Sequence, residues 1–232
     1  MKIFIAIPVF DGKLQSPTVG CLLTEQSIAH GVGDELLVYF LPNCSNLTLG
    51  RDMLVKRFLE SDCERMFFLD ADITFEPGAL LKLCHRPEDF VAGCTRYKKD
   101  VESYPIRWLP KAELWLDENG LLEIQMVGTA FMSLSRNVFK VIKDSAPGRE
   151  YENYGEVFNC YFEMPFKDRT LYGEDGYFCK SWRDAGGKIF IDPELEITHW
   201  DFNKPYAGHI GKWLKNRMNN QQGENHENLS EI

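Results

Sequence analysis

The chain has 232 residues, of which 44% are hydrophobic, so it can bury the core of one large α/β domain or two small ones. Its net charge of −9 argues against a nucleic-acid-binding protein, because phosphate contacts need a basic surface. No apolar run approaches the ~20 residues of a membrane span, and the N-terminus has no signal-peptide pattern. The seven cysteines include no Cys-x-x-Cys pair, which predicts free thiols in a cytoplasmic, reducing location.

The first part of the chain alternates short apolar strands with helices. Strands are expected over residues 2–9, 35–41, 67–69 and 90–94. Helices are expected over residues 17–30, 49–59 and 79–83. Ser16 is expected to be the N-cap of the first helix, because Pro17 follows at the first helical position. This alternation predicts a parallel sheet with right-handed crossovers.

The pattern changes after Thr95. Strands are expected over 102–109, 121–126 and 127–134, and Asp117 to Gly120 reads as a hairpin turn. A helix over 136–143 leads into an irregular stretch, 145–169, which we expect to form loops and short strands around a binding cleft. Next come a helix over 176–185, the last strand over 188–191, an extended segment over 196–200 and a helix over 209–218. The polar residues 219–232 are expected to be disordered.

Two carboxylates, Asp70 and Asp72, follow the buried strand at residues 67–69. If the chain stays extended, both side chains leave the same face at the carboxyl edge of the sheet, where open α/β folds bind ligands. Like charges at this spacing repel each other, and a cation would relieve the repulsion. Mg²⁺ or Mn²⁺, shared with substrate phosphates, suits these oxygen ligands. The alternative is a solvated Asp-x-Asp loop that caps the next helix.

Further candidate residues come late in the sequence. Glu174 and Asp175 open a helix, where acidic side chains also favour the helix dipole without any catalytic role. His199 lies in the extended segment near the end, and a single histidine is more often structural than a ligand. The functional interpretation rests on the combination of these residues with Asp70 and Asp72.

The combination resembles the nucleotide-sugar-dependent glycosyltransferases of the GT-A fold, in the style of single-domain viral and bacterial members. The resemblance spans residues 2–200 and rests on these segments: Ile7-Pro8-Val9, Arg51-Asp52, Asp70-Ala71-Asp72, Gly93 with Arg96 to Lys99, Gly128 to Met132, Gly173-Glu174-Asp175 and Thr198-His199. It departs from the family at Asp52, where relatives carry Asn, and at Trp200-Asp201, where many relatives have a nearby Gly.

The resemblance implies a GT-A domain over residues 1–218, with a nucleotide-binding half (1–100) and an acceptor and catalytic half (101–218). It implies an α/β fold whose mostly parallel, Rossmann-like sheet carries a smaller antiparallel region on the acceptor side. The donor would be a nucleoside-diphosphate sugar, with UDP favoured over GDP, and the acceptor a hydroxyl of a glycan or another molecule.

The resemblance also implies residue roles. Asp72 and His199 would ligate Mn²⁺, or Mg²⁺, and Asp70 would hold the ribose, or the metal through water. Residues that contact the nucleotide would include Pro8, Arg51, Asp70, Asp72 and Lys98. Asp175, with Glu174 as second choice, would take the acceptor proton if the reaction inverts the anomeric centre. If the reaction retains configuration, Asp175 would instead position the acceptor or stabilise the sugar cation.

Several aromatic side chains are candidates for stacking on sugar rings, although each alone is more simply explained by packing: Trp108, Tyr154, Phe158, Tyr161, Phe162 and Tyr172. Three other functions stay open. Asp70 to Thr74 fits the nucleophile motif of haloacid-dehalogenase-like phosphatases, although two strand–helix units precede it. A nucleotidyltransferase of related fold would need a better phosphate loop than Asp11 to Lys13. A non-catalytic sugar-binding module would not explain the acidic pairs.

Overall fold

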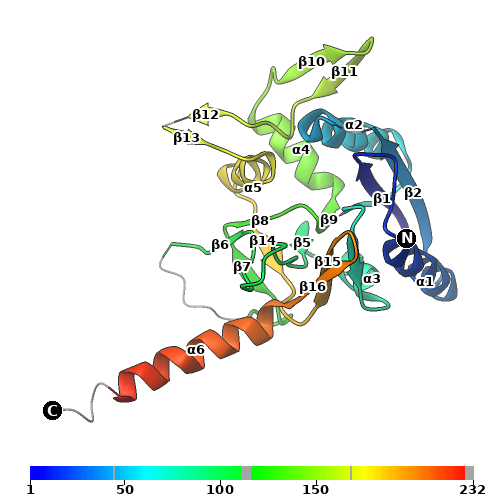
Figure 1. Cartoon of the computed structure of the whole chain (residues 1–232). Coiled ribbons are helices and arrows are strands. Elements are labelled where there is room, and N and C mark those ends of the chain that lie inside the picture. Colours follow the sequence, from blue (N-terminus) through cyan, green and yellow to red (C-terminus); the bar gives the residue numbers. More distant parts are fainter. Residues whose placement is uncertain (44, 111–115, 168, 228–232) are drawn as a thin grey trace.

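The structure is a computed structural model that describes residues 1–43, 45–110, 116–167 and 169–227. Within these residues the central sheet has seven strands in the order β2-β1-β3-β9-β5-β14-β7 (Figure 1). Its strands are β1 (Lys2–Val9), β2 (Glu35–Pro42), β3 (Arg65–Leu69), β5 (Phe90–Ala92), β7 (Leu122–Ile124), β9 (Phe131–Ser135) and β14 (Ile189–Ile191). All of these run in one direction except β9 and β7. The predicted α/β class with a mostly parallel sheet is confirmed.

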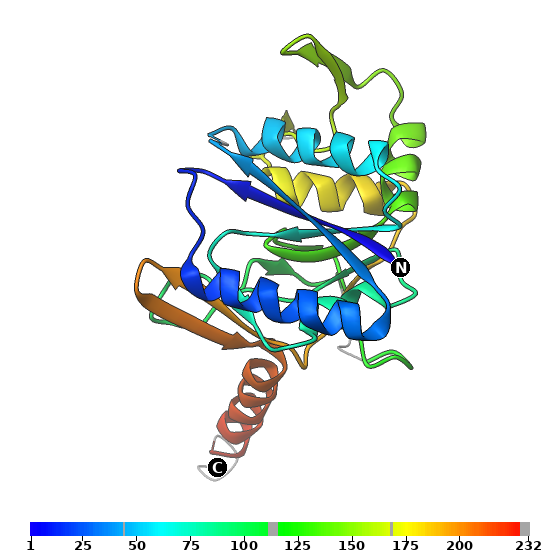
Figure 2. The same ribbon diagram turned by 90° about the vertical axis from the view of Figure 1, so that its right-hand side faces the viewer.

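Helices cover both faces of this sheet (Figure 2). Successive residues of β1 alternate between the faces, so that Ile3 and Ile5 belong to one core and Phe4 to the other. Helices α1 (Ser16–Val32) and α3 (Ala79–Cys84) pack on the Ile3 side. The Phe4 side is covered by α2 (Leu47–Glu60), α4 (Arg136–Ser145) and α5 (Glu174–Asp184). The continuous apolar sequence of the strands follows from this burial on both faces.

Smaller antiparallel sheets surround the centre. The strands β4 (Ile73–Phe75), β15 (Glu196–Asp201) and β16 (Lys204–His209) form one of them. A second pairs β6 (Ile106–Arg107) with β8 (Met126–Val127). Two hairpins, β10 (Glu150–Asn153) with β11 (Glu156–Asn159) and β12 (Phe166–Lys167) with β13 (Thr170–Leu171), lie in the stretch predicted to be loops and short strands. The last element is α6 (Ile210–Glu227).

The second half differs from the predicted elements in three places. The strand expected over 127–134 is interrupted after Val127, because Thr129 and Ala130 form a turn before β9 begins at Phe131. The strand expected over 102–109 shrinks to the two residues of β6. The strand at 188–191 is not the last one, because β15 and β16 follow it.

Two helices also differ from the prediction, the first one, α1, at its start and the last one, α6, at its end. The N-cap of α1 is Gln15 rather than Ser16, because Ser16 already has helical geometry and Pro17 occupies the first turn. At the other end, α6 continues past Asn219 as far as Glu227, over a stretch predicted to be disordered. The final five residues of that tail lie outside the described part. No described helix is both long and apolar enough to cross a membrane.

Candidate functional site

The pairing of β15 with β4 brings His199 to the Asp-x-Asp turn. Asp72 lies between β3 and β4, and its carbonyl accepts a hydrogen bond from the Trp200 amide at 2.9 Å. In the antiparallel register of these strands, His199 lies opposite Ile73. The imidazole Nε2 is therefore 3.5 Å from Asp72 Oδ2, although 127 positions of sequence separate the two residues. The predicted proximity of these residues exists in the structure.

A lysine and a backbone carbonyl complete the surroundings of this pair. His199 Nδ1 lies 3.0 Å from the Arg96 carbonyl, so Nδ1 donates to it and Nε2 faces Asp72. Lys98 Nζ donates to Asp72 Oδ2 at 2.6 Å. Burial favours the neutral Asp72 carboxyl, but His199 and Lys98 outweigh it and hold its pKa below the ordinary value. The carboxylate at residue 72 is thus kept ionised, as a metal ligand must be.

Arg51 on α2 connects Asp70 to α5, the helix that carries Glu174 and Asp175. Its side chain is only 4% exposed and donates to Glu174 Oε1 at 2.7 Å, and its second guanidinium nitrogen is 3.8 Å from Asp70 Oδ1. Burial outweighs Arg51 and raises the pKa of Asp70. Arg51 therefore connects the carboxyl end of β3 to the first turn of α5. Arg51 Nε is buried and has no hydrogen-bond partner among the described residues.

The two acidic residues that open α5 have different environments. Glu174 is held by Arg51, while Asp175 Oδ1 accepts a hydrogen bond from the Gly176 amide at 2.6 Å. Burial, and then the negative charge of Glu174, raise the pKa of Asp175. Among the described residues, Glu174 thus has an ion-pair partner, whereas the Asp175 carboxylate accepts only a backbone hydrogen bond.

A cavity of about 490 Å³ opens beside Asp70 and Asp72. Its walls include Pro8, Arg51, Asp70 and Asp72, four of the residues predicted to contact a nucleotide, together with the exposed rings of Phe10 and Phe202. We call it the Asp72 cavity. Lys98 is not among its lining residues but reaches it through the Asp72 carboxylate.

The donor atoms at the Asp72 cavity fit a divalent cation that is shared with a substrate. Among the described residues, no group of three or more His, Cys, Asp or Glu side chains could hold a metal by itself. Mg²⁺ and Mn²⁺ usually take one or two carboxylates and complete their shell with substrate phosphates and water. Asp72 and His199 supply one oxygen and one nitrogen, so a phosphate-bearing ligand would have to provide further oxygens.

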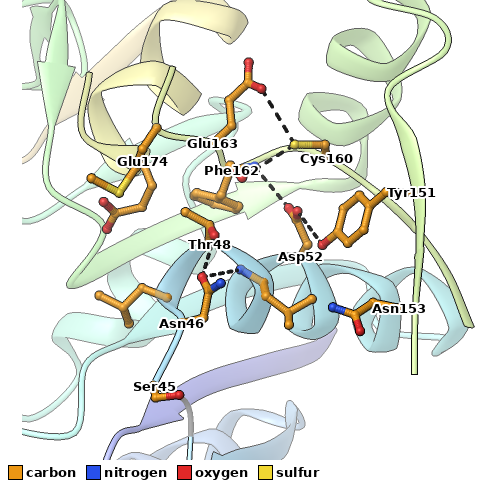
Figure 3. Close-up of a pocket in the computed structure, with 13 residues that line it drawn as sticks. Ser45, Asn46, Thr48, Asp52, Tyr151, Asn153, Cys160, Phe162, Glu163 and Glu174 are labelled. Carbon is orange, nitrogen blue, oxygen red and sulfur yellow. Dashed lines mark hydrogen bonds between the residues drawn. The ribbon is translucent and has the colours of Figure 1, made fainter. Parts of the chain in front are cut away.

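Asp52, the neighbour of Arg51, has a structural role that the sequence did not predict. Only 2% exposed, it accepts hydrogen bonds from the amides of Tyr161 and Phe162 through Oδ1 and from the Tyr151 hydroxyl through Oδ2 (Figure 3). An Asn at this position, as the resemblance implies, would present a donor in place of Oδ2. Burial raises the pKa of Asp52 to about 7. Its only sequence signal is an acidic residue between the apolar positions of a helix.

The aromatic candidates divide between the core and the surface. Phe158, Tyr161 and Phe162 are at most 3% exposed and pack in the core, as the simpler interpretation expected, although Phe162 also lines a cavity. Tyr154 is 78% exposed at the tip of the β10–β11 hairpin. Six of the seven cysteines are free thiols, and Cys44 lies outside the described residues.

No protein-family model and no curated protein matches the sequence. Among solved structures, A197 from STIV superposes with a TM-score of 0.52 at 16% identity, covering 86% of this chain and 85% of that one. A glycosyltransferase involved in glycosylation of the major capsid of PBCV-1 matches at TM-score 0.34 and 14% identity, covering 63% and 68%. The inositol-1-phosphate CTP transferase from T. maritima matches at 0.42 and 14%, covering 86% and 89%. The first likeness shows a shared fold, and the other two are too distant to carry an argument.

Proposed function

We propose that this protein is a metal-dependent glycosyltransferase, which moves a sugar from a nucleoside-diphosphate sugar to a hydroxyl group of a glycan or another acceptor. The observation that carries the proposal is the 3.5 Å approach of His199 Nε2 to Asp72 Oδ2, because Asp72 lines a cavity that Asp70 and Arg51 also line. A buried arginine and two further acidic residues surround them. The motifs that resemble GT-A glycosyltransferases supply these same side chains.

The diphosphate would lie in the Asp72 cavity. Asp72 and His199 would hold Mn²⁺ in preference to Mg²⁺, because imidazole is a better ligand for the softer ion. When bound, that cation would supply Lewis-acid stabilisation of the charge on the leaving diphosphate. Arg51, which lines this cavity, and Lys98 would add positive charge at the same place. Asp70 would accept hydrogen bonds from the ribose, and UDP is the nucleotide we favour.

Asp175 would act as general base in an inverting transfer. The acceptor oxygen would form a bond to C1 of the sugar as the bond from C1 to the phosphate oxygen breaks, and the nucleoside diphosphate would leave with that electron pair. The acceptor proton would pass to the Asp175 carboxylate, whose raised pKa suits it to accept a proton near neutral pH. Glu174, fixed by Arg51, would position the start of α5.

The test is to incubate the protein and Mn²⁺ with a panel of UDP- and GDP-sugars and to identify the products. We expect release of the nucleoside diphosphate with transfer of the sugar to an acceptor or, slowly, to water. Pyrophosphate formed from a nucleoside triphosphate and a sugar phosphate would indicate a nucleotidyltransferase instead. Release of inorganic phosphate from simple phosphate esters would indicate the haloacid-dehalogenase-like alternative. Either of those results, without sugar transfer, would overturn the proposal.

A further inference from the structure

A second cavity, of about 840 Å³, lies beside Asp52 and Phe162 (Figure 3). Three elements form it: the start of α2, the segment around the β10–β11 hairpin, and the first residue of α5. We call it the Asp52 cavity. Its lining residues are Ser45, Asn46, Leu47, Thr48, Leu49, Asp52, Tyr151, Asn153, Cys160, Phe162, Glu163, Met164 and Glu174. Its size is within the range of small-molecule sites, which is about 300–1,000 Å³.

The Asp52 cavity adjoins the Asp72 cavity. Leu47 lines both of them. The Arg51–Glu174 ion pair, at 2.7 Å, connects the two, because Arg51 belongs to the wall of the Asp72 cavity and Glu174 to the wall of the Asp52 cavity. A molecule in the Asp52 cavity would thus reach the first turn of α5, where Asp175 follows Glu174.

The charge of the lining restricts the class of ligand. Three carboxylates line the Asp52 cavity, at Asp52, Glu163 and Glu174, and no lysine or arginine is among its described lining residues. Glu163 is paired with Arg149, and Glu174 with Arg51, so both guanidinium groups are already engaged by protein carboxylates. An anionic ligand would lose its hydration without gaining a cationic partner. Neutral molecules with many hydroxyl groups could donate to these carboxylates.

The remaining lining residues suit the faces of a sugar ring. Tyr151 supplies aromatic surface, and Asn46, Thr48 and Asn153 supply polar groups around it (Figure 3). Aromatic walls with a few polar groups are the common composition of small-ligand pockets.

Asp52 fixes the shape of this cavity in the unliganded protein. Its carboxylate ties α2 to the Tyr151 hydroxyl and to two backbone amides, those of Tyr161 and Phe162. The wall formed by residues 151–162 is thereby attached to the wall formed by α2. A cavity that exists before the ligand arrives loses less conformational entropy on binding than one that must be assembled.

We propose that the Asp52 cavity is the acceptor site, and that its acceptor is an uncharged, hydroxyl-rich glycan rather than a phosphorylated or carboxylated molecule. The assignment of this cavity to the acceptor rests on the proposed function. The binding of a neutral glycoside in the cavity does not depend on a sugar donor. The acceptor hydroxyl would enter from the Glu174 side of the cavity, towards Asp175.

The Met164 methyl group provides a direct probe, because Met164 lines the Asp52 cavity and not the Asp72 cavity. The experiment titrates methyl-¹³C-methionine-labelled protein with a panel of neutral 4-nitrophenyl hexosides, and then with the corresponding hexoside 6-phosphates and glucuronides. Comparison with Met164→Leu assigns the signal among the seven methionines. We expect a saturable shift of the Met164 signal with at least one neutral glycoside and none with the anionic compounds. No shift with any neutral glycoside, or a shift with the anionic ones, would overturn the inference.

Thr48→Arg offers a second, independent test, since it places a long cationic side chain in the lining. Thr24→Arg on α1 is the matched control: Thr24 also lies on an exposed helix surface and also makes one local hydrogen bond, but on the other face of the sheet. We expect Thr48→Arg to weaken glycoside binding at least ~10-fold, or about 1.4 kcal/mol. Thr24→Arg should leave it unchanged. Equal glycoside affinity in both variants would place the binding elsewhere.

A parallel titration with UDP and Mn²⁺ separates the two proposals. Glycoside binding at Met164 without any UDP binding would support the Asp52 cavity as a sugar site and count against the glycosyltransferase. UDP binding without a glycoside response at Met164 would leave the proposed function standing and refute the acceptor site.

Discussion

The Asp72 and Asp52 cavities are connected by the Arg51–Glu174 ion pair and differ in their charge. The first combines acidic side chains with Arg51 and Lys13 in its wall and has Lys98 on Asp72, so opposite charges are close together. The second has three carboxylates and no cation in its described lining. In the first, cationic neighbours lower the pKa of Asp72, and in the second burial raises the pKa of Asp52. One cavity thus suits a diphosphate with a cation, and the other suits a neutral polyol.

The chemistry is expected at the start of α5, where Asp175 follows Glu174 of the Asp52 cavity. We predict that Asp175→Asn lowers the transfer rate roughly 10²–10⁴-fold, because an amide cannot take the acceptor proton. Affinity for UDP should stay the same, since Asp175 does not line the Asp72 cavity. Initial rates of sugar transfer, with UDP calorimetry as the control for folding, measure the two effects. Full activity in this variant would remove Asp175 as the base.

Arg51 connects Asp70 to Glu174 at the start of α5. We predict that Arg51→Ala lowers the free energy of unfolding by about 1.5–3 kcal/mol, because it leaves the partially buried carboxylates of Asp70 and Glu174 without their cationic partner. The control is Arg57→Ala on the same helix, whose partially exposed ion pairs with Glu60 and Glu156 should contribute about 0–1 kcal/mol. Urea unfolding measures both changes. Similar losses in the two variants would show that the Arg51 pairs are no more important than surface pairs.

A substitution of Asp52 tests the electrostatics of the Asp52 cavity. Its raised pKa means that the folded protein holds this proton more tightly than the unfolded chain, so its contribution to stability is lost as pH rises from the ordinary value of 3.8 to about 7. Asp52→Asn carries no charge and avoids this loss. We predict that the variant is more stable than the unsubstituted protein by about 2–4 kcal/mol at pH 8, and that the advantage disappears near pH 4.

Urea unfolding at a series of pH values measures this difference. A stability difference that does not change between pH 4 and pH 8 would show that Asp52 does not titrate in that range. Comparing the two proteins at each pH cancels the contributions of other groups, including Asp72, whose lowered pKa acts in the opposite direction.

The smallest effect is expected far from both cavities. Helix α6 points away from the body of the protein (Figure 1), and the chain beyond Asn219 is polar, with few groups to bury. We predict that removal of residues 220–232 changes neither the melting temperature nor the activity. Thermal unfolding of the shortened chain measures the first. A loss of more than ~4 °C would correspond to about 1 kcal/mol or more and would show that this segment packs on the domain.

The sequence predicted the Asp72 cavity better than the Asp52 cavity, for a physical reason. Strands such as 67–69, buried on both faces, leave a strong apolar signal, and their carboxyl ends bring Asp70 and Asp72 to a known edge. His199 could be placed only through the resemblance, because the β15–β4 pairing that brings it to Asp72 spans most of the chain. The strand β16 was missed because Lys204 and Pro205 begin it and little of it is apolar.

The Asp52 cavity could not be derived from local pattern. Its walls come from the start of a helix, a hairpin in an aperiodic stretch and the first residue of another helix. The role of Asp52 depends on backbone amides more than 100 residues away, and an acidic residue inside a helix normally indicates a solvated position. Only the folded chain shows that three elements enclose this space.

The most direct test of the central claim is the affinity of the protein for UDP, measured by calorimetry with Mn²⁺ and with EDTA. If Asp72 and His199 share a cation with the diphosphate, UDP should bind at least ~10-fold more tightly with Mn²⁺, a difference of about 1.4 kcal/mol or more, and Asp72→Asn should lose that difference. Equal UDP affinity in Mn²⁺ and in EDTA would contradict the account.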